Sequence, residues 1–204
     1  MTWLTVQNET TLATKSILKW GFKAKAERLA KQYREELKIH PCGVLCAFKL
    51  AEHLSIPIHP ATKFLTLENE IEWLSNKSEW SALTMPNFEG TKLILHNPFH
   101  SNARQQSDLM HELAHIICEH KHEEVYYETP LPFGMRNYNT EEEEEAKCLG
   151  STLQLATPCL LWANKKGLNT KAIAEHFNAS MEMVTYRMNM TGISKRAYYK
   201  SKPT

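Results

Sequence analysis

The sequence predicts an α+β protein in which helices dominate and the sheet is small. Several long stretches place apolar side chains at the three- and four-residue spacing of a helix, whereas only two short runs have the apolar character of strands. The chain has 204 residues, enough for one compact unit with a small appendage. We expect a main domain with N-terminal helices over residues 1–164 and a smaller C-terminal subdomain over residues 165–204.

Composition and charge narrow the class of protein. Hydrophobic residues make up 42% of the chain and charged residues 23%, values typical of a soluble globular protein. The formal net charge is +1, so overall charge does not favour a nucleic acid or a membrane as a partner. The five cysteines are scattered, and the sequence shows neither a signal-peptide pattern nor an apolar run of membrane-spanning length. We therefore expect a cytoplasmic protein.

The first elements follow from the spacing of apolar residues. A helical period extends over about residues 15–38, where glutamates among the lysines indicate a solvated surface rather than a DNA-binding face. A second helix ends near His53, and a short strand follows at about residues 56–58. A second strand-like run, "TKLILHNP" (residues 91–98), ends at its Asn-Pro pair.

The next helix contains "DLMHELAHIICEH" and begins at about Ser101 or Ser107. His111 and His115 lie one helical turn apart, so both can bind one metal ion, and Glu112 can accept a proton from a water that the metal activates. Composition alone produces such a motif in about 1 in 25 comparable sequences, so the motif by itself suggests a metal site and does no more than that. The other face of the helix is apolar, and we expect it to pack on the core while the histidines line a cleft.

The third protein ligand determines whether the site is catalytic or structural, because a catalytic zinc has three protein ligands and one position for water. The metzincin continuation fails, since Cys118 and Lys121 replace its glycine and its third histidine. Cys118, His120 or His122 could instead close a structural site. The other source of a ligand is the glutamate run at residues 141–145.

The glutamate run opens a helix predicted over about residues 140–164, whose first four residues fit a capping box. Glu143 shares a helical stripe with two small residues, Ala146 and Gly150, which would let this helix approach the motif helix closely. Amphipathicity instead favours Glu142 as the inward-facing glutamate. Spacing alone therefore leaves the choice between the two glutamates open.

A last helical pattern, at about residues 169–190, resembles a helix-turn-helix. Asn178 suits the left-handed turn position, and Ser180 can cap the second helix. Arg187 and several cations near the C-terminus supply positive charge, so DNA contact in a major groove is one interpretation. Four methionines suit packing or protein contact better than base recognition, and we favour a hairpin packed on the main domain.

Two blocks of the sequence resemble the ImmA/IrrE family of zinc metallopeptidases. They are "NPFHSNARQQSDLMHELAHIICEH" and "EEEAKCLGSTLQLATPCLLWA", and "GFKAKAERLAKQYREELKIHP" is similar to the family's N-terminal helical segment. The resemblance covers about residues 20–195 and implies a mainly helical, zincin-like peptidase unit. It assigns the Zn²⁺ ligands to His111, His115 and Glu143 and the general base to Glu112.

Two positions depart from the family pattern. Lys147 replaces the usual Asn or Asp after Ala146, where its charge could pair with Glu143 and weaken zinc binding. The proline of the second block, Pro158, is displaced by two positions, a change that we expect to be harmless.

The resemblance implies a zinc-dependent endopeptidase, a hydrolase that often cleaves a helix-turn-helix repressor of a mobile element or a stress response. We expect a protein substrate of this kind and no membrane partner, and DNA binding is not favoured. Candidates for substrate or oxyanion contact are Arg104, His100, Tyr126 and Tyr127, and the strand "KLILH" could pair with an extended substrate. The alternative is a non-catalytic regulator that binds a repressor or DNA through the C-terminal hairpin and holds a structural metal.

Overall fold

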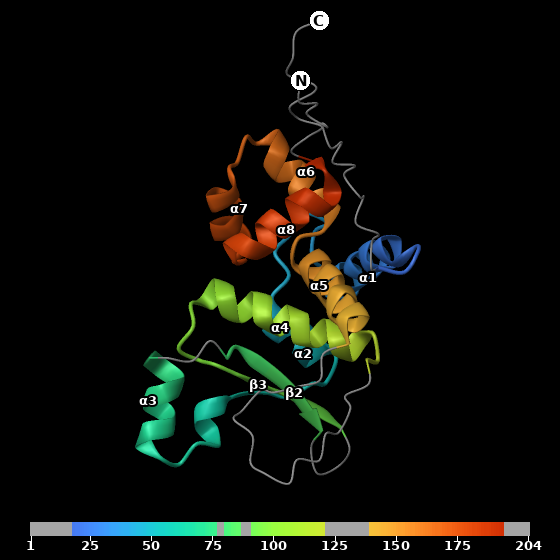
Figure 1. The fold of residues 1–204 in the computed structure, drawn as a ribbon. Coiled ribbons are helices and arrows are strands. Elements are labelled where there is room, and N and C mark those ends of the chain that lie inside the picture. Colours follow the sequence, from blue (N-terminus) through green and yellow to red (C-terminus); the bar gives the residue numbers. More distant parts are fainter. Residues whose placement is uncertain (1–17, 77–79, 87–90, 121–138, 194–204) are drawn as a thin grey trace, which may run out of the picture.

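The computed structural model of the protein describes residues 18–76, 80–86, 91–120 and 139–193, and it confirms the α+β class. Helices dominate, and a three-stranded sheet lies at one end of the molecule (Figure 1). Among these residues, no helix combines the length and the apolar content that crossing a bilayer requires. The helices are α1 (Phe22–Glu36), α2 (Ala47–His53), α3 (Glu68–Asn76), α4 (Asn102–Ile117), α5 (Thr140–Gln154), α6 (Thr157–Lys165), α7 (Thr170–Phe177) and α8 (Met181–Thr191), and the strands are β1 (Ile58–Pro60), β2 (Ala82–Pro86) and β3 (Lys92–His96).

The sheet has β3 at its centre. This strand pairs in parallel with β1 and antiparallel with β2, so that Ile94 lies opposite Ile58 on one side and Thr84 on the other. The prediction that "KLILH" accepts an extended substrate is therefore wrong, because both edges of β3 are already paired. Within the described ranges, β2 has one edge without a neighbouring strand.

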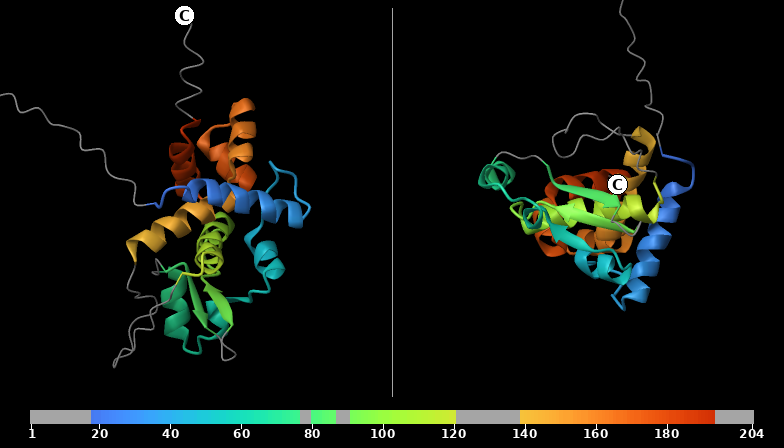
Figure 2. Two further views of the ribbon diagram at one scale, coloured as in Figure 1. Left: turned by 90° about the vertical axis from the view of Figure 1, so that its right-hand side faces the viewer. Right: turned by 90° about the horizontal axis from the view of Figure 1, so that it is seen from below.

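Helix α4 occupies the middle of the fold. The sheet lies on one side of it and α6 to α8 lie on the other, while α5 packs against both α4 and α1 (Figure 1 and Figure 2). Ser101 caps α4, since its side chain accepts a hydrogen bond from the backbone N–H of Arg104. The predicted apolar stripe is confirmed by Leu109, Met110 and Leu113, which are fully buried. This packing fixes the opposite face, which carries the motif histidines.

Gly150 allows α5 to approach α4 closely, as its place on the small-residue stripe predicts. A Cβ atom at this position would lie 2.7 Å from the carbonyl oxygen of Met110 and 3.0 Å from the Cα of His111. Both are backbone atoms of α4, which cannot move away as a flexible side chain would. The absence of a side chain at Gly150 therefore sets the distance between the two helices that carry the candidate metal ligands.

We expect Gly150→Ala to lower the free energy of unfolding by about 2 kcal/mol, because a clash with backbone atoms lies at the upper end of the cost of overpacking, about 3 kcal/mol, whereas the helix preference of alanine offsets only about 1 kcal/mol. Urea unfolding of the metal-free protein measures this difference. Arg28→Ala, at an exposed position of α1, serves as the control and should change stability by less than about 0.5 kcal/mol. A Gly150→Ala protein as stable as the wild type would contradict the close helix contact.

The C-terminal hairpin has the predicted turn. Asn178 between α7 and α8 is left-handed (φ 49°, ψ 49°), and Ser180 caps α8 by accepting a hydrogen bond from the backbone N–H of Met183. The backbone N–H of Ser180 also donates to the hydroxyl of Ser107 at 2.9 Å, which attaches the start of α8 to α4. The hairpin thus packs on the main body, while a domain boundary after residue 164 stays a prediction.

Two details of the α5–α6 region differ from the predictions. Residues 140–164 form two helices instead of one, because Leu155 leaves the helical conformation (φ −127°, ψ 67°) and Pro158 has no N–H to donate back into α5. The capping box is also wrong. The residue before α5, Asn139, caps the helix instead, and its side chain accepts a hydrogen bond from the backbone N–H of Glu141.

Arg187 is a buried structural residue rather than a surface cation. Its side chain is 3% exposed and donates from Nη2 to Glu27 Oε1 at 2.7 Å and from Nε to the carbonyl oxygen of Leu155 at 2.9 Å. Glu27 also accepts hydrogen bonds from the backbone N–H and the hydroxyl of Thr157, so this group joins α1, α6 and α8. The DNA-binding interpretation therefore loses one of its cations. The others, after residue 193, lie outside the described part of the chain.

Candidate metal centre

The candidate ligands meet where α4 and α5 lie side by side. His111 Nε2 lies 3.1 Å from His115 Nε2, and the Glu143 oxygens lie 3.2 Å from His111 Nε2 and 3.3 Å from His115 Nε2. Each of the three residues thus offers a ligand atom within 4.8 Å of the other two, and we call this group the ligand triangle; His115 is buried and the other two residues are partly exposed. The glutamate of this triangle is Glu143 and not Glu142, as the family resemblance implies and amphipathicity does not.

The dimensions of this triangle fit a metal ion. Zinc with tetrahedral ligands at about 2.0–2.1 Å separates neighbouring ligand atoms by about 3.3 Å. The two histidine nitrogens are 3.1 Å apart, and each lies 3.2 or 3.3 Å from a different oxygen of the Glu143 carboxylate, so either oxygen can complete the set. Two imidazole nitrogens and one carboxylate oxygen are also the donors of a catalytic zinc site, because they leave a fourth position for water.

The Glu143 carboxyl is held in its charged form. Burial alone would raise its pKa, but the hydrogen bonds and charges of His111 and His115 outweigh this effect and hold the pKa well below its ordinary value. Lys147, expected as a competing partner, instead lies 4.0 Å from an oxygen of Glu144 and 4.7 Å from the ring centre of Tyr186. The departure from the family pattern at this position therefore leaves Glu143 directed toward the histidines.

Glu112, the candidate general base, is buried and is held by the edge strand of the sheet. Its Oε2 accepts a hydrogen bond from the backbone N–H of Thr84 in β2 at 2.8 Å and another from the Thr84 hydroxyl at 2.5 Å. Two donors from one residue fix the position of the carboxylate. Thr84 is not predicted from the sequence, because nothing in a short polar-apolar segment indicates contact with a helix 28 residues later.

The predicted substrate contacts divide into two groups. Arg104, in the first turn of α4, and His100, just before the helix, both lie near Asp108, with nitrogen–oxygen distances of 3.7 and 3.8 Å. Burial raises the pKa of the Asp108 carboxyl, while a hydrogen bond from Ser81 and the charges of Arg104 and His100 act in the opposite direction. These residues therefore form an ion-pair group beside the ligand triangle rather than a part of it. Both tyrosines, Tyr126 and Tyr127, lie outside the described residues.

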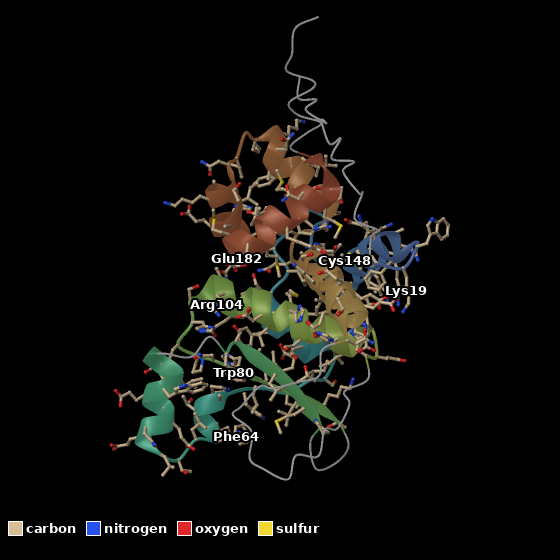
Figure 3. All side chains as sticks on the ribbon, viewed as in Figure 1. Lys19, Phe64, Trp80, Arg104, Cys148 and Glu182 are labelled. Atoms are coloured by element: carbon tan, nitrogen blue, oxygen red, sulfur yellow. The ribbon has the colours of Figure 1, made fainter. Side chains whose placement is uncertain are left out.

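A groove follows the same side of α4. One pocket of about 640 Å³ contains His111, Lys147 and Tyr186 in its lining, so it is bounded by α4, α5 and α8. A second pocket of about 910 Å³ shares lining residues with the first and extends to the start of α4, where Arg104 and Glu182 lie on opposite sides (Figure 3). The C-terminal hairpin thus forms one wall of a groove that ends at a candidate metal ligand.

His120 and Glu145 form a second polar group behind the ligand triangle. His120 Nδ1 lies 2.9 Å from His115 Nδ1, and His120 Nε2 lies 3.2 Å from Glu145 Oε2. With Cys118, these residues also place three potential ligand atoms within 4.8 Å of one another. The closed site considered from the sequence does not form around His111 and His115, which are grouped with Glu143 instead. The remaining candidate for that site, His122, is outside the described ranges.

Comparison with known proteins agrees with this geometry. The family model for the IrrE N-terminal-like domain matches residues 68–189, which is more than half of the chain and includes both helices of the ligand triangle. No curated protein matches the chain by sequence. The ligand triangle indicates a metal site, and the family match indicates a metallopeptidase. The chain therefore belongs to the ImmA/IrrE family of metallopeptidases.

Proposed function

We propose that this protein is a cytoplasmic, zinc-dependent endopeptidase that cleaves a regulatory protein, namely a helix-turn-helix repressor of a mobile element or a stress response. The observation that carries the proposal is the triangle of His111, His115 and Glu143, with Glu112 next to the first ligand in the same helix. Two imidazoles and one carboxylate are the ligand set of a catalytic zinc, and the family match supports peptide hydrolysis as the reaction.

The residues around the triangle have distinct tasks in this proposal. Zinc bound there would supply Lewis-acid chemistry, which acidifies a water molecule and polarises a peptide carbonyl group. Glu112 accepts the proton of the attacking water and passes it to the leaving amine. Thr84 keeps the Glu112 carboxylate in position through its two hydrogen bonds.

Two features support an extended polypeptide as the substrate. The outer edge of β2 has no neighbouring strand among the described residues, and Thr84 of this strand contacts Glu112. A peptide that adds to this edge would therefore lie beside the general base. The groove between α4 and α8 offers a second contact surface, where Arg104 and Glu182 can bind charged side chains of either sign.

The test is a cleavage assay with the zinc-loaded, full-length protein and the helix-turn-helix repressor encoded by the neighbouring gene. Mass spectrometry identifies new peptide N-termini. We expect a small number of defined cleavage sites, their loss after chelation with 1,10-phenanthroline, and their return when zinc is added. Cleavage that continues without metal would contradict the proposal. A repressor that is bound but stays intact would support the non-catalytic regulator instead.

A further inference from the structure

The end of α4 turns His120 back onto His115. The helix ends at Ile117 with Cys118 as its C-cap, and Glu119 adopts a left-handed conformation (φ 57°). The backbone N–H of Glu119 donates to the carbonyl oxygen of Ile116, and that of His120 donates to the carbonyl oxygen of His115, each at 3.0 Å. This is the Schellman arrangement of a helix C-terminus. It brings the two imidazole rings together, with their centres 5.0 Å apart.

A buried line of polar contacts leads from His115 to a carboxylate. The Nδ1 atoms of His115 and His120 are 2.9 Å apart, and His120 Nε2 lies 3.2 Å from Glu145 Oε2. The three side chains are only 6%, 5% and 9% exposed. Lys19, which Figure 3 shows beside α5, lies 3.4 Å from the other Glu145 oxygen and forms an ion pair with it. The line therefore ends on a carboxylate that is paired with a cation.

The positions of the protons in this line follow from metal binding. Only one proton can lie between the two Nδ1 atoms. His115 faces the ligand triangle with Nε2, so a metal there takes the Nε2 lone pair and leaves the proton of His115 on Nδ1. His115 then donates to His120 Nδ1, and His120 carries its own proton on Nε2 and donates it to Glu145. Every donor in the line has an acceptor.

We propose that His120 and Glu145 are positioning residues, which fix the tautomer and the ring orientation in which His115 binds the metal. The inference rests on the metal centre proposed above. A hydrogen bond from the second nitrogen of a metal-binding histidine to an acceptor behind it is a general feature of metal sites, and its loss weakens metal binding about 10–100-fold. Here the acceptor is a second histidine, oriented in turn by Glu145.

The same proton count opposes a second metal ion on Cys118, His120 and Glu145. A metal on His120 Nε2 would move the proton of His120 to Nδ1, and His120 would then donate to His115. His115 would carry its proton on Nε2 and could no longer bind a metal in the ligand triangle. The chain should therefore bind one zinc ion.

Long-range ¹H–¹⁵N NMR of the imidazole rings tests the assignment directly in the zinc-loaded, full-length protein. We expect the proton of His115 on Nδ1 and that of His120 on Nε2. A proton on Nδ1 of His120 would overturn the proposal. This readout uses the wild-type protein and does not depend on how any variant folds.

Zinc affinity, measured by competition with a chromophoric chelator, provides the second test. We expect His120→Leu to weaken zinc binding by about 10–100-fold, and His120→Asn, which keeps an acceptor for His115, to restore most of the affinity. Cys118→Ser is the matched control and should leave both the affinity and the stoichiometry of one zinc unchanged. Loss of a second zinc in Cys118→Ser would instead show a second metal site.

The outcomes separate this inference from the proposed function. A wild-type protein that binds one zinc, together with a His120→Leu protein of equal affinity and an unchanged His115 tautomer, would overturn the positioning role and leave the metal centre intact. A wild-type protein that binds no zinc would overturn both.

Discussion

Replacing Glu112 by glutamine is expected to lower kcat for peptide hydrolysis by about 10²–10⁴-fold, while the protein still binds one metal ion per chain. The amide has the same shape, and its oxygen can accept the two hydrogen bonds from Thr84, so the side chain should stay in place. It cannot accept a proton at neutral pH. The cleavage rate of the repressor and the zinc content of the same sample, determined by plasma mass spectrometry, together measure the effect.

The matched control is Glu119→Gln, which makes the same chemical change at an exposed position just beyond the end of α4. This variant should retain wild-type activity, because its side chain is outside the groove. Wild-type hydrolysis by Glu112→Gln would exclude Glu112 as the general base. Loss of zinc from Glu112→Gln would indicate instead that Glu112 supports the ligand triangle.

Replacing Glu143 by alanine should weaken zinc binding more than the loss of a supporting residue does, that is, by more than about 100-fold. The change removes the one carboxylate of the ligand triangle, whose two oxygens lie 3.2 and 3.3 Å from the histidine nitrogens, and leaves only the histidine pair of α4. Hydrolysis should be lost together with the metal. Chelator competition measures the dissociation constant, and circular dichroism verifies that the metal-free variant remains folded.

Glu142→Ala is the matched control, because it removes the same side chain from the neighbouring position of α5. We expect this variant to bind zinc as tightly as the wild type, since Glu142 is not part of the ligand triangle. Zinc loss from Glu142→Ala and normal binding by Glu143→Ala would show that amphipathicity, and not the family resemblance, identifies the third ligand.

The sequence predicts those parts of the structure that follow from local rules. The apolar stripe of α4, the left-handed turn at Asn178 and the cap at Ser180 depend on neighbours within one or two turns, and each is observed. The close approach at Gly150 is also predicted, because small residues on the inward stripe of a helix leave room for the backbone of a second helix. In each case one residue type and its spacing are sufficient.

Other parts depend on contacts between distant segments, which spacing does not reveal. The strand β2 is five residues long and ends in Pro86, and it is stabilised by its pairing with β3 rather than by its own composition. The helical period in the sequence begins near residue 15. Within the described residues, however, α1 begins at Phe22, directly after Gly21, whose φ is positive. Arg187 has the sequence context of a surface cation and becomes a core residue only through Glu27.

The candidate site shows the same division. His111, Glu112 and His115 are recognisable from one helix, and Glu143 follows from the resemblance. The contacts made by Thr84, His120 and Glu145 can be predicted only when the fold is known, because these residues lie on a strand edge, after a reversed turn and on a second helix. His120 follows His115 by five positions, a spacing that predicts no shared helical face. The left-handed residue Glu119 between them turns the chain back and brings the two rings together.

The ion pair between Arg187 and Glu27 has a consequence for the order in which the protein matures. Its partners are 160 residues apart, and it helps to hold α1, against which α5 packs, in place. Contacts of such long range form late, because the chain must close a large loop before they can stabilise anything. On the ribosome, both motif histidines emerge before α5 is anchored. We therefore expect a growing chain to lack a stable metal centre until α8 has emerged and Arg187 has met Glu27.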